Sequence, residues 1–321
     1  MMRAAFAALC LSLAAPAAAG DFMLGLPIAC NPGEDCHIQQ YVDADPGPGA
    51  QDYRCGPLSY DGHKGTDFAL TDLSAMTAGV PVLAAAPGVV TALRDGMADG
   101  AYYQGDAQAV EGRECGNGVV IDHGDGWETQ YCHMHRGTVQ VAKGARVDQG
   151  DVLGAVGLSG KSEFPHLHLS VRHNGEVIDP FAPQSARCGE ATENDLWQET
   201  PLYEPGGLLA AGFAPGIPGY DAIKAGRAAV GALAPDAPAL VLFGYAFGGQ
   251  AGDVIRIVID GPGGTLTDQS AELEKDQAQL FRAAGKRQPQ GGWPVGRYSG
   301  SVSLMRDGEE IDRQEVGITI E

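Results

Sequence analysis

Three short stretches of the sequence carry histidines at spacings that could place them around one metal ion. His63 and Asp67 stand four residues apart in the first stretch, and His133 lies in the second. In the third, His166 and His168 stand two residues apart, so on a β-strand they project from the same face. Nitrogen and oxygen ligands of this kind suit Zn²⁺, whose catalytic sites use three protein ligands and leave a fourth position for water.

These residue types predict metal-assisted hydrolysis of an amide. We expect His63, Asp67 and His168 to bind one zinc ion per chain. Zinc lowers the pKa of its bound water to roughly 7, which provides a hydroxide nucleophile at neutral pH. The amide carbonyl must also be polarised and the leaving nitrogen protonated, and His133 and His166 are the candidates for these tasks.

Short β-prone runs separated by Gly and Pro surround the histidine stretches. Two such runs, 118–123 and 128–133, flank the turn 124–126, which predicts a hairpin with His133 at or near the end of its second strand. Gly65, between the first two ligands, is expected to let the backbone turn tightly. Residues 95–113 break the strand pattern and predict a long loop bordering a substrate groove.

Composition limits the classes of partner. The chain has 321 residues, 44% of them hydrophobic, which is enough for a sizeable core and favours two domains. Lys and Arg total 21 against 41 Asp and Glu, and the net charge of -20 repels a phosphate backbone, so no nucleic-acid partner is expected. Residues 1–19 are typical of a secretory signal peptide. No later run approaches the length of a membrane span, so a soluble protein outside the cytoplasm is expected.

The cysteines predict disulfides. Of seven cysteines, Cys10 falls in the signal peptide, and the remaining six form an even set in an exported chain. Sequence alone does not select among the connectivities that six cysteines allow. We favour three pairs, on short spacing, on flanking one predicted hairpin and by elimination respectively: Cys30–Cys36, Cys115–Cys132 and Cys55–Cys188. The alternative role as zinc thiolates is disfavoured by an oxidising compartment and by the complete set of harder ligands.

Changes in composition divide the mature chain. Residues 20–55 are rich in Pro, Gly and Asp and predict an irregular lead-in pinned by a disulfide, without a regular element. Residues 56–190 form the predicted antiparallel zinc domain, and the Pro and Gly residues of 191–219 predict a linker. Alternating strands in 220–321 predict an immunoglobulin-like β-sandwich. Residues 272–284 have a helix-forming composition, and their state stays open.

Three motifs between about Tyr60 and Pro180 resemble, in order and spacing, those of the lysostaphin-type zinc metallopeptidases. They are His63-x-Gly65-x-Asp67, Tyr131-x-His133 after an Asp-His-Gly hairpin, and Pro165-His166-Leu167-His168 followed by Asn174-Gly175 and Asp179-Pro180. The resemblance implies an all-β fold, with an antiparallel, duplicated hybrid motif-like peptidase domain and a narrow groove. It implies that the HxxxD pair and the last histidine of HxH bind zinc, while the isolated histidine and the first histidine of HxH assist catalysis. Leu169-Ser170 departs from the Phe-Glu often found there, which bears on substrate preference.

The sequence therefore predicts a secreted zinc metalloendopeptidase that acts on the peptide stems of bacterial peptidoglycan. The alanine-rich leader and the lack of a long wall-binding repeat favour a Gram-negative periplasm, where the resemblance favours the D-alanine–diaminopimelate bond. A protein partner that binds through the sandwich is a further expectation. The alternative is a non-catalytic periplasmic regulator on the same fold that activates another cell-wall hydrolase. Such relatives typically lose metal ligands, whereas all three are present here.

Overall fold

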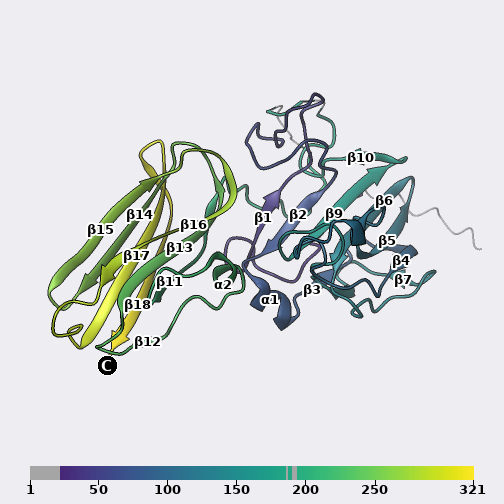
Figure 1. The fold of residues 1–321 in the computed structure, drawn as a ribbon. Helices are drawn as coiled ribbons and strands as arrows, with labels where there is room; N and C mark the ends of the chain where they lie inside the picture. The colour runs from purple at the N-terminus through teal and green to yellow at the C-terminus, as the bar shows by residue number, and fades with distance from the viewer. Residues whose placement is uncertain (1–21, 186, 190–193) are drawn as a thin grey trace, which may run out of the picture.

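The computed structural model describes residues 22–185, 187–189 and 194–321. The predicted signal peptide, with Cys10, lies outside the described residues. The described chain is almost entirely β-structure, as the sequence predicted, and it forms a sheet-rich N-terminal part beside a C-terminal sandwich (Figure 1). Among the described residues, no helix has both the length and the apolar character needed to cross a membrane.

One large sheet organises the N-terminal part. Its eight strands are β1 (Cys36–Gln40), β2 (Thr66–Leu70), β4 (Gly88–Arg94), β5 (Asn117–Gly124), β6 (Trp127–Met134), β7 (Arg146–Val147), β9 (His166–His173) and β10 (Glu176–Ile178). Their order is β1-β2-β9-β6-β5-β4-β7, with β10 paired to β9. The central strand β9 lies between β2 and β6, so the three histidine stretches, far apart in the chain, become neighbours.

Smaller elements complete this part. A second sheet pairs β3 (Pro81–Leu83) with β8 (Val152–Ala155), the helix α1 (Leu73–Ala78) follows β2, and the 3₁₀ helix η1 (Gln108–Val110) lies within the predicted long loop. Apolar side chains from both sheets share one core, in which Phe68, Tyr131 and Leu167 are fully buried. The predicted hairpin is formed by β5 and β6.

The lead-in contains a strand that the sequence analysis did not predict. The expectation of no regular element in 20–55 is wrong for β1, which pairs antiparallel with β2 at the edge of the large sheet. Ile38 packs into the core, while the hydrogen bonds of β1 come from a strand some thirty residues downstream. The Pro and Gly residues around β1 indicate irregular structure, and the pairing that makes it a strand is with a segment remote in the sequence, so local composition does not predict it.

Three disulfides link the cysteines in the pairs that the sequence favoured: Cys30–Cys36, Cys55–Cys188 and Cys115–Cys132. The second joins the beginning of the N-terminal part to its end, and the third lies next to His133. Disulfides form and persist in oxidising environments, so these pairs indicate an oxidising compartment.

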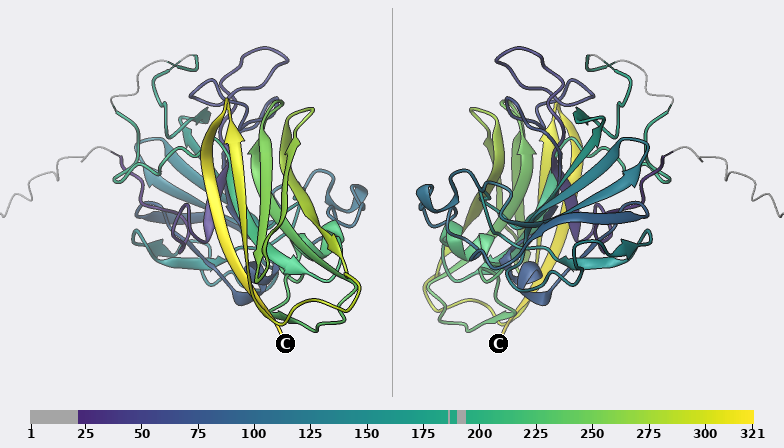
Figure 2. Two further views of the ribbon diagram at one scale, coloured as in Figure 1. Left: turned by 90° about the vertical axis from the view of Figure 1, so that its left-hand side faces the viewer. Right: turned by 90° about the vertical axis from the view of Figure 1, so that its right-hand side faces the viewer.

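The C-terminal part is a sandwich of a three-stranded and a five-stranded sheet, ordered β11-β13-β16 and β12-β18-β17-β14-β15 (Figure 2). Its elements are β11 (Gly207–Ala214), α2 (Tyr220–Lys224), β12 (Ala232–Leu233), β13 (Ala239–Gly249), β14 (Val254–Gly261), β15 (Gly264–Glu272), β16 (Gln277–Arg287), β17 (Gly296–Arg306) and β18 (Glu309–Ile320). Leu242, Ile257 and Leu304 lie in its core.

Two segments of the sandwich differ from what local composition indicated. β11 comes from the stretch predicted as a linker, and β16 comes from the stretch with helix-forming composition. β11 and β16 pair with β13, one on each side, so the hydrogen bonds to this central strand outweigh local propensity.

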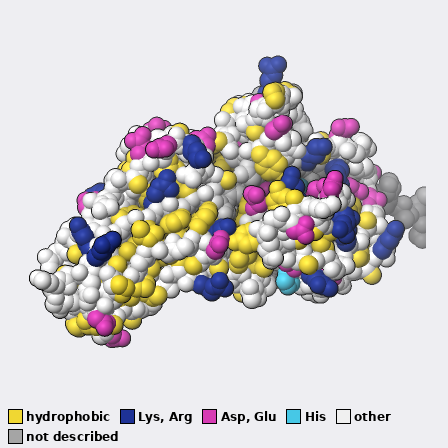
Figure 3. All heavy atoms as spheres, viewed as in Figure 1, with side chains coloured by type: hydrophobic (Ala, Val, Ile, Leu, Met, Phe, Trp, Pro, Cys, Tyr) yellow, Lys and Arg dark blue, Asp and Glu magenta, His cyan; other side chains and the backbone are white. Residues whose placement is uncertain are grey.

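Acidic and basic side chains are interspersed over the face of the molecule shown in Figure 3.

The sandwich packs against the edge of the large sheet, where β1 is the nearest strand in Figure 1. Gln39 Nε2 donates a hydrogen bond to the carbonyl of Ala278 at 3.0 Å, and Gln279 Nε2 donates to Gln39 Oε1 at 3.0 Å. The ring of His37 lies 4.2 Å from that of Phe247, between centroids. Buried side chains of β1 therefore contact both β13 and β16 of the sandwich.

Candidate metal centre

The fold brings the three predicted ligands together. Asp67 on β2 lies opposite His168 on β9, and His63 lies three residues before the start of β2. His63 Nε2 is 3.3 Å and His168 Nδ1 is 2.8 Å from Asp67 Oδ1, and the two nitrogens are 3.2 Å apart. Ligand atoms of a tetrahedral zinc with bonds of about 2.0 Å are separated by about 3.3 Å. The triangle formed by His63 Nε2, His168 Nδ1 and Asp67 Oδ1 thus has the size that zinc requires.

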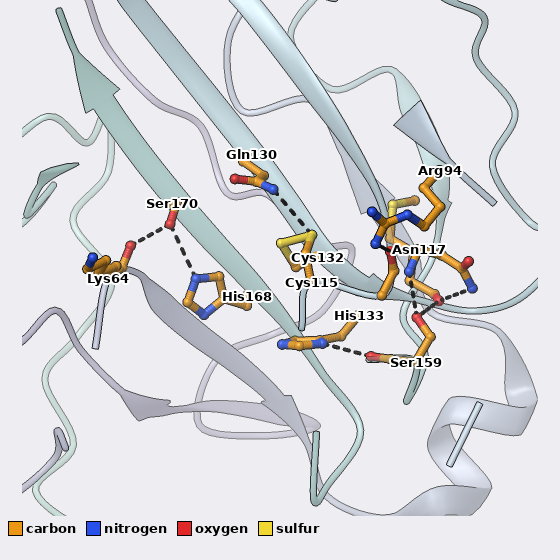
Figure 4. Close-up of a disulfide and its surroundings, with 12 residues drawn as sticks. Lys64, Arg94, Cys115, Asn117, Gln130, Cys132, His133, Ser159, His168 and Ser170 are labelled. Carbon is orange, nitrogen blue, oxygen red and sulfur yellow. Dashed lines mark hydrogen bonds between the residues drawn. A yellow bond between two sulfur atoms is a disulfide. The ribbon is translucent and has the colours of Figure 1, made fainter. Parts of the chain in front are cut away.

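Hydrogen bonds on the far side of each ring orient these nitrogens. His63 Nδ1 lies 2.7 Å from the carbonyl of Tyr41, which can only accept, so the His63 proton is on Nδ1. His168 Nε2 contacts Ser170 Oγ at 3.3 Å, and the Ser170 hydroxyl donates to the carbonyl of Lys64 (Figure 4). Two lone pairs and a carboxylate oxygen then face one another, an arrangement that a cation stabilises. The residues present therefore fit a zinc ion.

Gly65 allows this close approach. A Cβ atom at this position would lie 2.5 Å from His168 Nε2 and 2.7 Å from the carbonyl oxygen of Leu169. Real Cβ atoms do not approach other atoms so closely, and the carbonyl cannot move without disturbing β9. The glycine expected from the sequence to permit a tight turn thus leaves the space that the His168 ring occupies.

His133 and His166, the two histidines predicted to assist catalysis and called the helper histidines below, lie beside the triangle formed by the three ligand atoms. His166 Nε2 is 3.5 Å from Asp67 Oδ1, and the ring centroids of His133 and His166 are 4.6 Å apart. His133 Nδ1 lies 2.8 Å from the carbonyl of Ser159, and His166 Nδ1 lies 2.9 Å from the carbonyl of Phe164. Each ring therefore carries its proton on Nδ1 and has a lone pair on Nε2.

His133 has a left-handed backbone conformation, with φ of 62°. A residue with a Cβ adopts this region at some cost, and such residues cluster at functional sites. Its amide donates to the carbonyl of Cys115 at 2.8 Å, and the Cys115–Cys132 disulfide holds the same two segments together (Figure 4). The disulfide and this hydrogen bond over-determine a conformation that turns the imidazole toward the groove.

Burial controls the charges of these groups. It lowers the pKa of His133 well below its ordinary value, with the neighbouring His166 and His168 acting in the same direction. It also lowers the pKa of His166, against the attraction of Asp67. Burial would raise the pKa of Asp67, but the neighbouring imidazoles of His63, His166 and His168 hold it well below the usual range. At neutral pH the site thus combines a carboxylate with neutral helper imidazoles.

A groove of about 490 Å³ opens beside the triangle, and Asp67, His133 and His166 line it. The predicted long loop contributes Tyr102 to its wall. Tyr60, which the sequence analysis did not assign, also lines the groove; it is 53% exposed and its ring centroid lies 4.4 Å from that of His63.

Two supporting residues were also not assigned. Ser170 is two residues beyond His168 on one strand, so the alternation of a strand already placed both on one face. Tyr41 supplies a carbonyl from the segment after β1, and no local pattern marks that role. Both orient an imidazole of the triangle rather than facing its centre.

A family model, curated proteins and solved structures each match part of this chain. Residues 61–180 match the family model described as Peptidase family M23. DD-carboxypeptidase/endopeptidase Mpg of Neisseria meningitidis is 34% identical over 134 residues, which is 40% of this chain and 25% of that protein. Peptidoglycan DD-endopeptidase ShyA of Vibrio cholerae is 32% identical over 136 residues, which is 42% of this chain and 26% of that protein. The chain thus spans about a quarter of the length of these relatives.

Among solved structures, the catalytic domain of the prophage-encoded M23 protein EnpA from Enterococcus faecalis is 23% identical. The match covers 52% of this chain and 100% of that chain, with a TM-score of 0.34.

Proposed function

We propose, from the premise that residues 61–180 form a domain of peptidase family M23, that the protein is a zinc metalloendopeptidase that hydrolyses peptide cross-links of bacterial peptidoglycan. The observation that carries the proposal is the convergence of His63 Nε2, His168 Nδ1 and Asp67 Oδ1 beside two neutral imidazoles in a groove. The names of the two relatives, a DD-carboxypeptidase/endopeptidase and a peptidoglycan DD-endopeptidase, support the substrate class.

His63, Asp67 and His168 would hold the metal, and zinc bound there supplies a polarising Lewis acid and a water that ionises near neutral pH. We assign to His166 Nε2, next to Asp67, the acceptance of a proton from the attacking water and its return to the leaving amine nitrogen. His133 Nε2, with its lone pair toward the groove, accepts a hydrogen bond that orients the water or the substrate. The products are a carboxylate and an amine.

Within peptidoglycan, the D-alanine–diaminopimelate bond is the favoured target, because a DD-endopeptidase is named among the relatives. The three disulfides are consistent with secretion into an oxidising compartment, and we propose the Gram-negative periplasm.

The test combines zinc content with release of peptides from purified cross-linked peptidoglycan. We expect the wild type to contain zinc and to cleave. His168→Ala should lose both zinc and activity, whereas His166→Ala should keep zinc and lose activity. His173→Ala, at the opposite end of β9, is the matched control and should behave as wild type.

Two results would contradict the proposal. A zinc-loaded wild type that releases no peptides would exclude peptidoglycan hydrolysis under these conditions. A wild type that binds no zinc would favour the alternative, a regulator that uses the same groove to bind another hydrolase.

A further inference from the structure

The sandwich supplies part of the wall of the groove at the candidate metal centre. The groove of about 490 Å³ that contains His133 and His166 is also lined by Gly248, Gly249 and residues 276–278 of the sandwich. A second hollow of about 510 Å³ adjoins it and shares Tyr102, Glu163, Phe164 and residues 276–278 with it. A path thus leads from the helper histidines along the junction of the two parts of the molecule.

The sandwich side of this path is held in place. Ala278 accepts a hydrogen bond from Gln39 on β1, and Tyr245 donates to Gln279 Oε1 at 2.6 Å. The carboxylate of Asp276 accepts a hydrogen bond from the amide of Ala251 at 2.8 Å. A wall fixed before the substrate arrives loses little conformational entropy on binding. Asp276 and the first residues of β16 can therefore serve as a binding surface.

Lys224, at the end of α2, lies at the far end of the path. Its ammonium is 4.6 Å from the ring centroid of Tyr103, in the long loop, and 4.9 Å from that of Tyr220. Its carboxylate partner Asp221 is 3.5 Å away with a side chain 92% exposed, so that pair is weak. Two aromatic faces position the ammonium, and its charge stays available for an anion.

The chemistry of the lining fits a peptide with a free carboxylate. The chain has six lysines, and three of them, Lys161, Lys224 and Lys275, line the two hollows of a protein whose net charge is -20. Glu163 and Asp276 also line the hollows and contribute negative charge. The positive charge at the end of the path away from the metal centre therefore comes from Lys224 and Lys275. Gln40 Oε1 is buried without a hydrogen-bond partner among the described residues and lines the groove, where a substrate amide N–H could bind it.

We propose that the long loop and the sandwich together form a substrate-binding site for a carboxylate, centred on Lys224 and separate from the metal centre. The inference rests on the proposed function, and it adds that the enzyme prefers anionic peptides over the corresponding amides. An ammonium–carboxylate hydrogen bond is stronger than its neutral counterpart, so the preference should be about tenfold in KM.

The test uses one soluble cross-linked muropeptide in two forms, with free carboxylates and with the carboxylates converted to amides. KM and kcat are measured for the wild type, Lys224→Gln and the control Lys286→Gln, an exposed lysine on β16 outside both hollows. We expect the wild type and the control to show KM about tenfold lower for the acid. Lys224→Gln should bind both forms with the same KM while kcat changes little.

Calorimetric titration of the two peptides into each protein separates this inference from the proposed function. If the wild type cleaves neither peptide but binds the acid more tightly through Lys224, the hydrolase proposal fails and the carboxylate site stands. If Lys224→Gln keeps the wild-type preference, the site is disproved. A higher kcat in Lys224→Gln would also disprove it, because Lys224 would then restrain the enzyme instead of recruiting substrate.

Discussion

Both parts of the molecule bury a carboxylate, but they satisfy it in different ways. In the sandwich, Asp253 is 2% exposed and accepts hydrogen bonds from Arg306 Nη2 at 2.7 Å, Arg306 Nε at 2.9 Å and the amide of Gln250 at 2.8 Å. In the sheet-rich part, Asp67 is 4% exposed and faces imidazole nitrogens whose protons are directed elsewhere. The first arrangement is complete within the protein, whereas the second requires a cation or added protons.

The means of stabilisation differ in the same way. The three disulfides of the described chain all lie in the sheet-rich part, where long irregular segments connect the strands around the groove. The sandwich instead has strands of up to 12 residues around a continuous apolar core. Buried polar groups that do not pair with one another thus mark a functional site, and covalent links hold the segments that present them.

The largest effect is expected from Gly65→Ala, and a glycine-to-alanine substitution in the sandwich is its control. Gly65→Ala places a methyl group against His168 and should lower zinc affinity and peptidase activity roughly 10- to 100-fold or more. Gly231→Ala, in the sandwich, should leave both unchanged, because a Cβ added there would meet no atom within 4 Å. Zinc titration and peptide release provide the measurements. Wild-type zinc binding by Gly65→Ala would refute the steric role of the glycine.

Breaking the ion pair between Arg306 and Asp253 in the sandwich should lower the stability of the protein without changing its zinc content. Arg306→Leu leaves Asp253 buried without its cation and should lower the free energy of unfolding by about 3 to 5 kcal/mol. Combining it with Asp253→Leu should recover a large part of the loss, since an apolar pair carries no unpaired charge. Urea denaturation measures both variants, and zinc content should match the wild type. A single variant as stable as the wild type would contradict this account.

Asp179 sharpens the comparison, because among the described residues no cation pairs with this carboxyl group. Burial raises its pKa to about 7, and it accepts a hydrogen bond from the amide of Phe181 at 2.9 Å. The folded state therefore keeps a proton that the unfolded chain, with a pKa of about 3.9, has lost. Stability should fall as pH rises from about 4 to about 7.

Asp179→Asn keeps the acceptor without the charge. It should remove this pH slope and exceed the wild type in stability by roughly 4 kcal/mol near pH 8, with little difference near pH 4. Chemical denaturation at both pH values tests it. An unchanged slope in the variant would show that another group is responsible.

The smallest effect should come from the contact between the two parts. Gln39→Leu removes the side-chain hydrogen bonds to Ala278, Gln279 and His37 and should cost about 1 to 2 kcal/mol. Because this contact couples the sheet to the sandwich, calorimetry should show the two parts unfolding at more widely separated temperatures than in the wild type. Gln314→Leu, whose side-chain amide bonds only within the sandwich, is the control. Identical unfolding profiles for Gln39→Leu and wild type would show that the contact does not couple them.

The features that sequence predicted depend on neighbours in the chain. The β5–β6 hairpin follows from a short turn between two β-prone runs, and the spacing of His166 and His168 places both on one face of β9. By contrast, β1 and β16 have unfavourable local composition and form strands because distant strands pair with them. Local patterns could not reveal the partners that decide these two elements.

By itself, the sequence determined the kinds of side chain available for a metal site, because His63, Asp67, His133, His166 and His168 are recognisable by type and spacing. Only the tertiary structure decided that β9 lies between β2 and β6. Two unprotonated imidazole nitrogens and one carboxylate oxygen meet as a result. The tertiary structure alone also placed the sandwich along the groove and Lys224 at the far end. Those arrangements result from strand pairing and packing between segments that are remote in the chain, which spacing along the sequence does not encode.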